Sequence, residues 1–219
     1  MIAPRRLWTN MRLGTRVRPG TIIRLGTIVG AIFCVVALGA CRSMPTRLYT
    51  LSVLPPLQAE TPYAGPALRV TAVQLPAATD RTEITTPLAR GGLEIHDFDH
   101  WAAPLSQLAR ETLTADLIAR LPKGRVILAP PDPANDAMNL SVTILAFSAE
   151  AHGAQFVASW QLTGGDGAAT GTGADLVMLQ CAPVTSASDV PERFSKLLGQ
   201  LADRIAARVA VAAPSAVLR

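Results

Sequence analysis

A leader that ends in a cysteine motif determines where the folded part of this chain begins. Six arginines and no acidic residue fall in the first 24 residues, and an apolar stretch, residues 25–38, follows them. This stretch is shorter than the roughly 20 residues that a membrane-spanning helix needs. It ends in the block Leu38-Gly39-Ala40-Cys41, in which small residues stand directly before a cysteine. We therefore predict that Leu38, Gly39 and Ala40 are recognised by lipoprotein signal peptidase and that Cys41 is lipidated.

This interpretation divides the chain into four parts. Residues 1–40 are a cleaved signal peptide, 41–47 a lipidated tether, 48–212 a single domain and 213–219 a flexible tail. An uncleaved anchor helix is the alternative, but it gives no reason for the small residues before Cys41.

The residue after the predicted lipidated cysteine bears on localisation. An aspartate there favours retention in the inner membrane of a Gram-negative cell, whereas this chain has Arg42. We therefore expect an outer-membrane protein that faces the periplasm. Extended residues 42–47 reach about 20 Å, so the body is expected to lie close to the membrane.

Removal of the leader changes the net charge of the chain from positive to negative. The whole chain has 20 basic and 16 acidic residues, and loss of six arginines leaves 14 basic against 16 acidic residues, a net charge of −2. This balance argues against a nucleic-acid partner, which requires a basic surface. Cys34 departs with the leader and Cys41 is modified, so Cys181 remains alone and is expected to be a buried strand thiol rather than part of an intrachain disulfide.

Periodicity predicts an α/β domain. Apolar residues recur at helical spacing in residues 104–121, and again from Asp189 to Val209, where Glu192 is expected to complete a capping box. Residues 164–173 are glycine-rich and predict a hairpin tip. We expect a mixed or largely antiparallel sheet covered by two long helices in one sandwich-like domain. The predicted strands are residues 48–53, 68–75, 84–89, 93–98, 125–129, 138–149, 155–162 and 174–181, with 84–89 and 93–98 forming a hairpin and the last three a meander.

No motif predicts catalysis. The segment 96–100 contains two histidines and two aspartates, but a structural zinc site needs four ligands and His152 is the only other histidine. We interpret this segment as a solvated hairpin arm and expect no metal or cofactor. The chain has no Gly-x-Ser-x-Gly motif, and residues 164–173 lack the Gly-Lys-Ser/Thr end of a phosphate loop.

Two residues stand out as candidate partner contacts. Arg81 follows Asp80 and is expected to pair with Asp80 or Asp99. Trp101 directly precedes a predicted helix, where it either completes the core or contacts another chain.

Several short blocks resemble one family in their order and spacing. They are Leu48-Tyr49-Thr50-Leu51 after the lipid-modified cysteine, Leu75-Pro76, Asp80-Arg81-x-Glu83-Ile84, Trp101-Ala102-Ala103-Pro104-Leu105 and the leucine-rich final helix. Together they resemble the PqiC-type ABC transport auxiliary lipoproteins, although this chain has Ala103 where the family usually has glutamate.

The resemblance implies a non-enzymatic outer-membrane lipoprotein that works with an MCE-domain protein and an inner-membrane permease and ATPase. Such a protein helps to move lipids between membranes and preserves envelope integrity, and it is expected to form homo-oligomers. Arg81, Trp101 and the hairpin between them are then the expected contact points. A periplasmic lipid-binding chaperone and an envelope hydrolase remain the alternatives.

Overall fold

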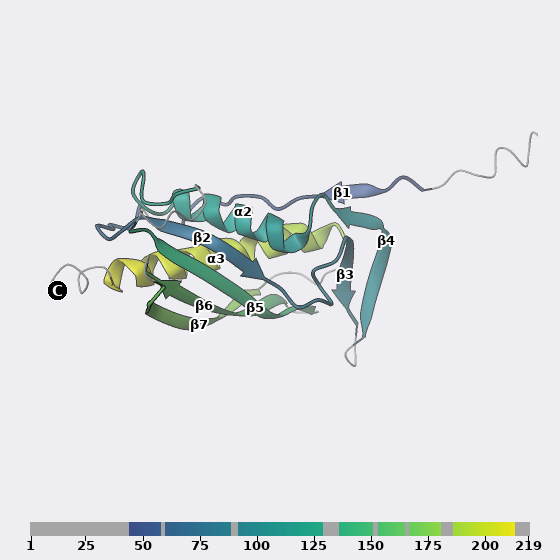
Figure 1. Ribbon diagram of the computed structural model, residues 1–219. Coiled ribbons are helices and arrows are strands. Elements are labelled where there is room, and N and C mark those ends of the chain that lie inside the picture. The colour runs from purple at the N-terminus through teal and green to yellow at the C-terminus, as the bar shows by residue number, and fades with distance from the viewer. Residues whose placement is uncertain are drawn as a thin grey trace, which may run out of the picture. The chain divides into compact units, whose positions relative to one another are not determined.

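The computed structural model describes residues 44–57, 60–88, 92–128, 136–150, 153–164, 167–180 and 186–212. The chain separates into the unit Met1–Met44 and the compact unit Pro45–Arg219, and all the elements below belong to the second unit (Figure 1). Their order along the chain is β1 (Arg47–Tyr49), β2 (Leu68–Gln74), β3 (Glu83–Pro87), β4 (Leu93–Trp101), α2 (Leu105–Ile118), β5 (Met138–Glu150), β6 (Gly153–Thr163), β7 (Ala169–Gln180) and α3 (Asp189–Ala212).

The strands form two sheets. A four-stranded sheet has the order β2-β5-β6-β7, with β5, β6 and β7 in an antiparallel meander and β2 parallel to β5. A three-stranded sheet has the order β1-β4-β3, in which β1 is parallel to β4 and β3 is antiparallel to it. The predicted α/β class is confirmed, as are the meander and the β3–β4 hairpin. The division of the strands between two sheets was not predicted.

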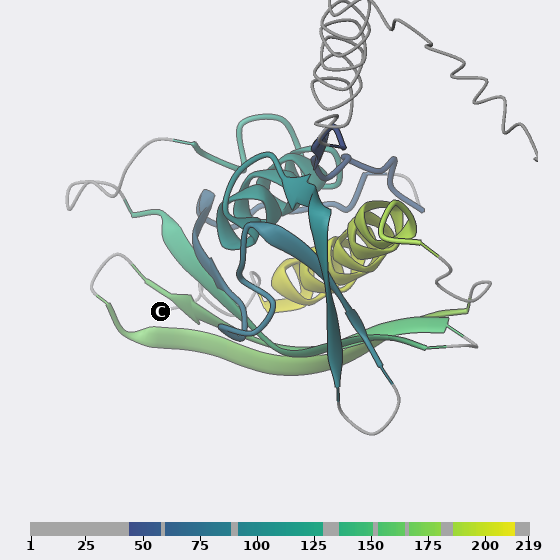
Figure 2. The same ribbon diagram turned by 90° about the vertical axis from the view of Figure 1, so that its right-hand side faces the viewer.

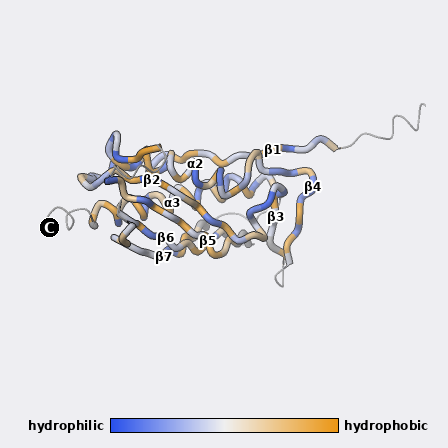
Figure 3. The backbone as a smooth tube through the Cα atoms, in the orientation of Figure 1, coloured by the Kyte–Doolittle hydropathy of each residue, from blue (hydrophilic) through white to orange (hydrophobic). Residues whose placement is uncertain are grey.

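Both helices lie on one side of the four-stranded sheet, which Figure 2 shows nearly edge-on. Alternate residues of β6 face the helices and are buried, as the strand period requires. The Phe194 ring of α3 contacts Phe147 of β5, with the two ring centroids 5.2 Å apart, and Phe156 of β6 at 6.1 Å. Figure 3 shows hydrophobic and hydrophilic residues interleaved along the elements, as expected where each has one buried face.

Three local expectations were wrong. Residues 125–128 form no strand, because Val126 makes only an isolated bridge to Leu68. The first strand ends at Tyr49 rather than at residue 53. The glycine-rich segment does not form a tip as far as residue 173, since β7 already begins at Ala169.

Two glycines in that segment have distinct structural roles. Gly167 has φ +79°, a conformation that favours glycine. A Cβ on Gly173 would lie 2.3 Å from the Trp160 ring, so only glycine lets this ring lie against β7. Gly173 is therefore a packing position within a strand rather than part of a flexible tip.

The start of α3 also differs from the prediction. The carboxylate of Asp189 accepts a hydrogen bond from the backbone N–H of Ser186, and the Ser186 hydroxyl accepts one from the N–H of Ser188. The capping pair is thus Ser186 with Asp189, whereas the Glu192 carboxylate bonds to Lys196 within the helix.

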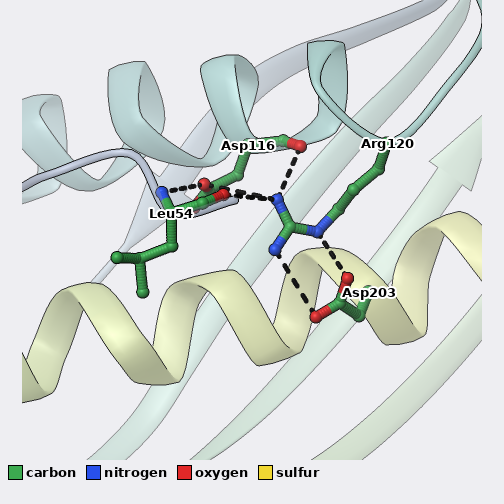
Figure 4. A network of polar contacts seen from close by, with 4 residues as sticks. All are labelled: Leu54, Asp116, Arg120 and Asp203. Atoms are coloured by element: carbon green, nitrogen blue, oxygen red, sulfur yellow. Dashed lines mark hydrogen bonds and ion pairs between the residues drawn. The ribbon is translucent and has the colours of Figure 1, made fainter. Parts of the chain in front are cut away.

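A buried arginine joins both helices to the segment that follows β1 (Figure 4). Arg120 Nε donates to Asp203 Oδ1 of α3 at 2.7 Å, and its Nη1 lies 3.4 Å from Asp116 Oδ1 of α2. The same Nη1 donates to the carbonyl of Leu54 at 3.2 Å, while the Leu54 N–H donates to Asp116 Oδ1 at 2.9 Å. Burial raises the pKa of Asp116 to about 6, against the lowering effects of the Leu54 N–H and Arg120.

We expect Arg120→Met to lower the free energy of unfolding by about 3–5 kcal/mol, because the change leaves the carboxylate of Asp116 buried without its cation. Urea unfolding at pH 7 measures the change. Arg110→Met, at an exposed site on α2, is the matched control and should stay within about 0.5 kcal/mol of the parent. Equal stability of the two variants would contradict a supporting role for Arg120.

We also expect Asp116→Asn to change the pH dependence of stability. The pKa of Asp116 is raised to about 6 in the folded state, whereas it is about 4 in the unfolded state. Between about pH 4 and 6, Asp116 therefore binds more protons in the folded state than in the unfolded state. Stability contributed by this group therefore falls as the pH rises from about 4 to 6, and the asparagine variant lacks that fall. Unfolding curves of the two proteins that run parallel across this window would contradict the assignment.

Candidate functional site

The β3–β4 hairpin has one buried arm, β3, and one largely exposed arm, residues 93–98 of β4. It pairs Thr85 with Ile95 and Thr86 with Glu94, at one end of the four-stranded sheet (Figure 1). Of β4 residues 93–98, only His96 is partly buried, so this arm is exposed on both faces. Four of the exposed side chains on and beside the hairpin are large and apolar: Leu88, Leu93, Ile95 and Phe98. Exposed apolar residues gathered in this way are typical of a contact surface.

A buried carboxylate holds the start of the domain against this hairpin. Asp99 of β4 accepts hydrogen bonds from Arg47 at 3.0 Å and from the Tyr49 hydroxyl at 2.9 Å. The strands β1 and β4 are also paired directly, with Arg47 opposite Asp99. We call Arg47, Tyr49 and Asp99 the β1 clamp.

The β1 clamp is ionised at neutral pH. Burial alone would raise the pKa of Asp99, but the hydrogen bonds from Tyr49 and Arg47 outweigh burial and hold this pKa below its usual range. A lowered carboxyl pKa contributes stability above the unfolded value, about 4, and that contribution is lost as the pH falls through the folded value. The contribution of Asp99 to stability is therefore present at neutral pH and lost in acid.

Arg81 lies in the turn before β3 and is exposed over 44% of its side chain. Its Nε lies 3.4 Å from Glu83 Oε2, so the expected pairing with Asp80 or Asp99 was wrong. An exposed pair of this kind contributes about 0–1 kcal/mol to stability. Arg81 can therefore leave Glu83 and pair with another acidic group at little cost. Asp80 instead accepts a hydrogen bond from the Ser106 N–H at 3.0 Å, which compensates for the missing side-chain cap at Pro104.

The structure places Trp101 in the core. Only 4% of its surface is exposed, and its backbone N–H donates to the carbonyl of Thr82 at 2.8 Å. Two roles were predicted for Trp101, completing the core or contacting another chain, and the structure shows core packing. Trp101 therefore supports the end of β4 from inside, and Arg81 is the candidate that lies on the surface.

The histidines of β4 make local contacts. His96 Nε2 lies 2.9 Å from the Thr86 hydroxyl and 4.0 Å from Glu94 Oε2, so hydroxyl and carboxylate meet the same ring nitrogen. A hydrolase triad instead places the acid on the other nitrogen. His100 Nε2 contacts the carbonyl of Asp97 at 3.0 Å. Within the described residues, no group of three or more histidine, cysteine or acidic side chains is placed to hold a metal ion.

Several predicted residues fall outside the described part of the chain. These are the recognition residues Leu38, Gly39 and Ala40, the lipidation site Cys41, and Cys181. Among the helices that the structure does describe, none combines the length and apolar character needed to cross a membrane.

Two polar clusters were not anticipated from the sequence. The first is the Arg120–Asp203 pair, and a surface pocket of about 220 Å³ lies beside it. This volume is below the roughly 300 Å³ at which small-molecule sites usually begin. Its lining residues are Pro56, Leu57, Thr61, Arg120, Asp203, Arg204 and Ala207.

The second cluster is centred on a buried carboxylate of β7. Asp175 accepts hydrogen bonds from the Trp160 indole at 2.9 Å and from Arg208 at 3.0 Å. Nearby, Arg204 donates to the carbonyl of Leu176 at 2.7 Å. The cluster ties α3 to β7, which lies at an edge of the four-stranded sheet.

Comparison with solved structures supports the fold. The crystal structure of a protein from Xanthomonas campestris has a TM-score of 0.62 and 14% sequence identity, covering 79% of this chain and 100% of that one. The crystal structure of an uncharacterized protein has a TM-score of 0.54 and 21% identity, covering 77% and 98%. At these identities the likeness establishes the fold alone.

Comparison of sequences identifies the family. No curated protein matches the chain. Residues 49–206 match the family described as the ABC-type transport auxiliary lipoprotein component. The match begins in β1, includes the whole β3–β4 hairpin and ends within α3. The chain therefore belongs to the ABC-type transport auxiliary lipoproteins.

Proposed function

We propose that this protein is a non-enzymatic outer-membrane lipoprotein that docks an MCE/ABC-type lipid transport system and supports membrane integrity. The family is one of auxiliary components of ABC-type transport, which supports association with such a transporter. One structural observation carries the proposal furthest. The strand that follows the predicted lipid anchor, β1, is paired directly with β4, the strand that presents the exposed hairpin.

The β1 clamp joins the predicted anchor to the proposed contact surface. Here the path is short: the predicted lipidated Cys41 precedes Arg47 by only six residues, and Arg47 is bonded to Asp99 beside the hairpin. A flexible linker would have to be much longer than these six residues for the domain to move independently of the anchor.

The proposed partner is an MCE-domain protein that acts with an inner-membrane permease and ATPase. The contact surface is Arg81 together with the exposed hairpin residues Leu88, Leu93 and Ile95, since a cation beside exposed apolar side chains suits a protein interface. Trp101 contributes from the core by holding β4 in place. We further propose that several copies assemble, so that their hairpins together form the docking surface.

The decisive experiment is affinity purification of the acylated protein from its native envelope, with mass spectrometry of proteins and lipids. Recovery of an MCE-domain protein with a permease and ATPase would support the proposal. Stoichiometric phospholipid without these proteins would favour the lipid-binding chaperone instead. Recovery of neither, in preparations that keep other envelope complexes intact, would refute the transport role.

Reversing the charge of the surface candidate tests the contact. We expect Arg81→Glu to reduce recovery of the MCE-domain protein severalfold and to lower resistance to detergent, with unchanged abundance of the lipoprotein. Immunoblotting, co-purification and growth on detergent give the three readouts. Arg110→Glu, which makes the same charge change on the exposed face of α2, should behave as the parent. Equal recovery with both variants would remove Arg81 from the contact.

A further inference from the structure

The β1–β4 pair has an inner and an outer face, which the β1 clamp distinguishes. Asp99 is bonded to both Arg47 and Tyr49, so these three side chains lie on one face of the paired strands. Asp99 is buried, which makes this the inner face. Because side chains alternate along a strand, Leu48 lies on the opposite, outer face, together with its pairing partner His100. Phe98 directly precedes Asp99, in the part of β4 where the pairing with β3 is irregular, and its side chain is exposed.

The outer face is apolar and exposed. Leu48 is 68% exposed and Phe98 is 41% exposed. They are diagonal neighbours across the strand pair, since Leu48 is opposite His100 and Arg47 is opposite Asp99. An aliphatic and an aromatic side chain at adjoining positions form a small apolar surface with a histidine beside it.

The length of the preceding chain determines what this face can meet. Leu48 follows the predicted lipidated Cys41 by seven residues, which span at most about 25 Å when extended. The acyl chains of Cys41 lie in the membrane, so the face lies within this distance of the lipid surface. The clamp keeps β1 in register with β4, so that Phe98 lies near Leu48, two residues along β4 from its partner His100.

We infer that this outer face, Leu48 with Phe98, lies in the interface of the membrane that holds the Cys41 anchor. The inference rests on the proposed lipidation. Aromatic and aliphatic side chains partition into the boundary between headgroups and acyl chains. Contact at this face holds the domain in one orientation about its anchor. Glu83 is opposite His100 on the other side of β4, so the Arg81–Glu83 pair borders the face at headgroup level.

A tryptophan probe tests the contact. Phe98→Trp is made in the mature acylated protein, which is reconstituted into vesicles of phosphatidylethanolamine and phosphatidylglycerol with brominated or unbrominated chains. The native Trp101 and Trp160 are buried, so they supply a constant background. We expect brominated lipid to remove most of the emission that the new tryptophan adds. Leu48→Trp is an independent probe of the same face, should Phe98→Trp fold poorly.

Leu176→Trp is the matched control. Leu176 is also an exposed leucine on a strand, 49% exposed, but it belongs to the four-stranded sheet. Its replacement should add emission that brominated lipid leaves unchanged. Quenching at positions 98 and 48 that equals that at 176 would overturn the inference. So would shielding of position 98 from aqueous iodide without quenching by brominated lipid, because a protein would then cover the face.

Flotation of the unsubstituted protein with the same vesicles tests the lipid anchor separately from the membrane contact of Leu48 and Phe98. A protein that fails to float lacks its anchor, and this outcome refutes the proposed lipidation. A protein that floats but shows no quenching at positions 98 and 48 keeps its anchor and refutes only the membrane contact.

Discussion

The buried guanidinium of Arg120 is the interaction on which the arrangement of the helices depends. It reaches across from the end of α2 to Asp203 of α3 and to the carbonyl of Leu54, so that one side chain joins three segments. A buried cation is tolerated only where anions and carbonyls surround it, and two carboxylates supply that environment. Gly199 of α3 lies beside the network, since a Cβ there would be 3.3 Å from the Leu54 side chain and 3.5 Å from Arg120.

The same network explains how the segment after β1 is held without belonging to a sheet. Buried backbone groups need partners, and side chains provide them here. The Ser52 N–H donates to the Ser195 hydroxyl of α3 at 3.0 Å, and the Leu54 N–H donates to Asp116 of α2. With the β1 clamp, these bonds attach the tether end of the domain to β4 and to both helices. The residues that follow the predicted tether are thereby fixed to the core at several points, which suits the proposed docking role.

Elements with strong local periodicity were predictable, and those that depend on distant partners were not. The buried residues of α2 include Leu105, Leu108, Leu113 and Leu117, whose spacing alone indicates a helix. The sequence suggested a strand at residues 125–129, but among the described residues of this segment only Val126 bridges to β2, at Leu68. For the site, the sequence indicated the hairpin and Arg81. The β1 clamp was missed because Asp99 and its partners lie about 50 residues apart in the chain.

The sequence by itself determined the predicted leader, the two helices, the meander and the family resemblance, because each depends on residue types at short, regular spacing. Only the tertiary structure decided that the strands form two sheets, that Trp101 is core, and that Asp99 and Asp116 bind the N-terminal segment. Both parallel pairings, β1 with β4 and β2 with β5, join residues more than 50 positions apart. Parallel strands are brought together by a long crossover rather than by a tight turn, so no local pattern records which strands will meet.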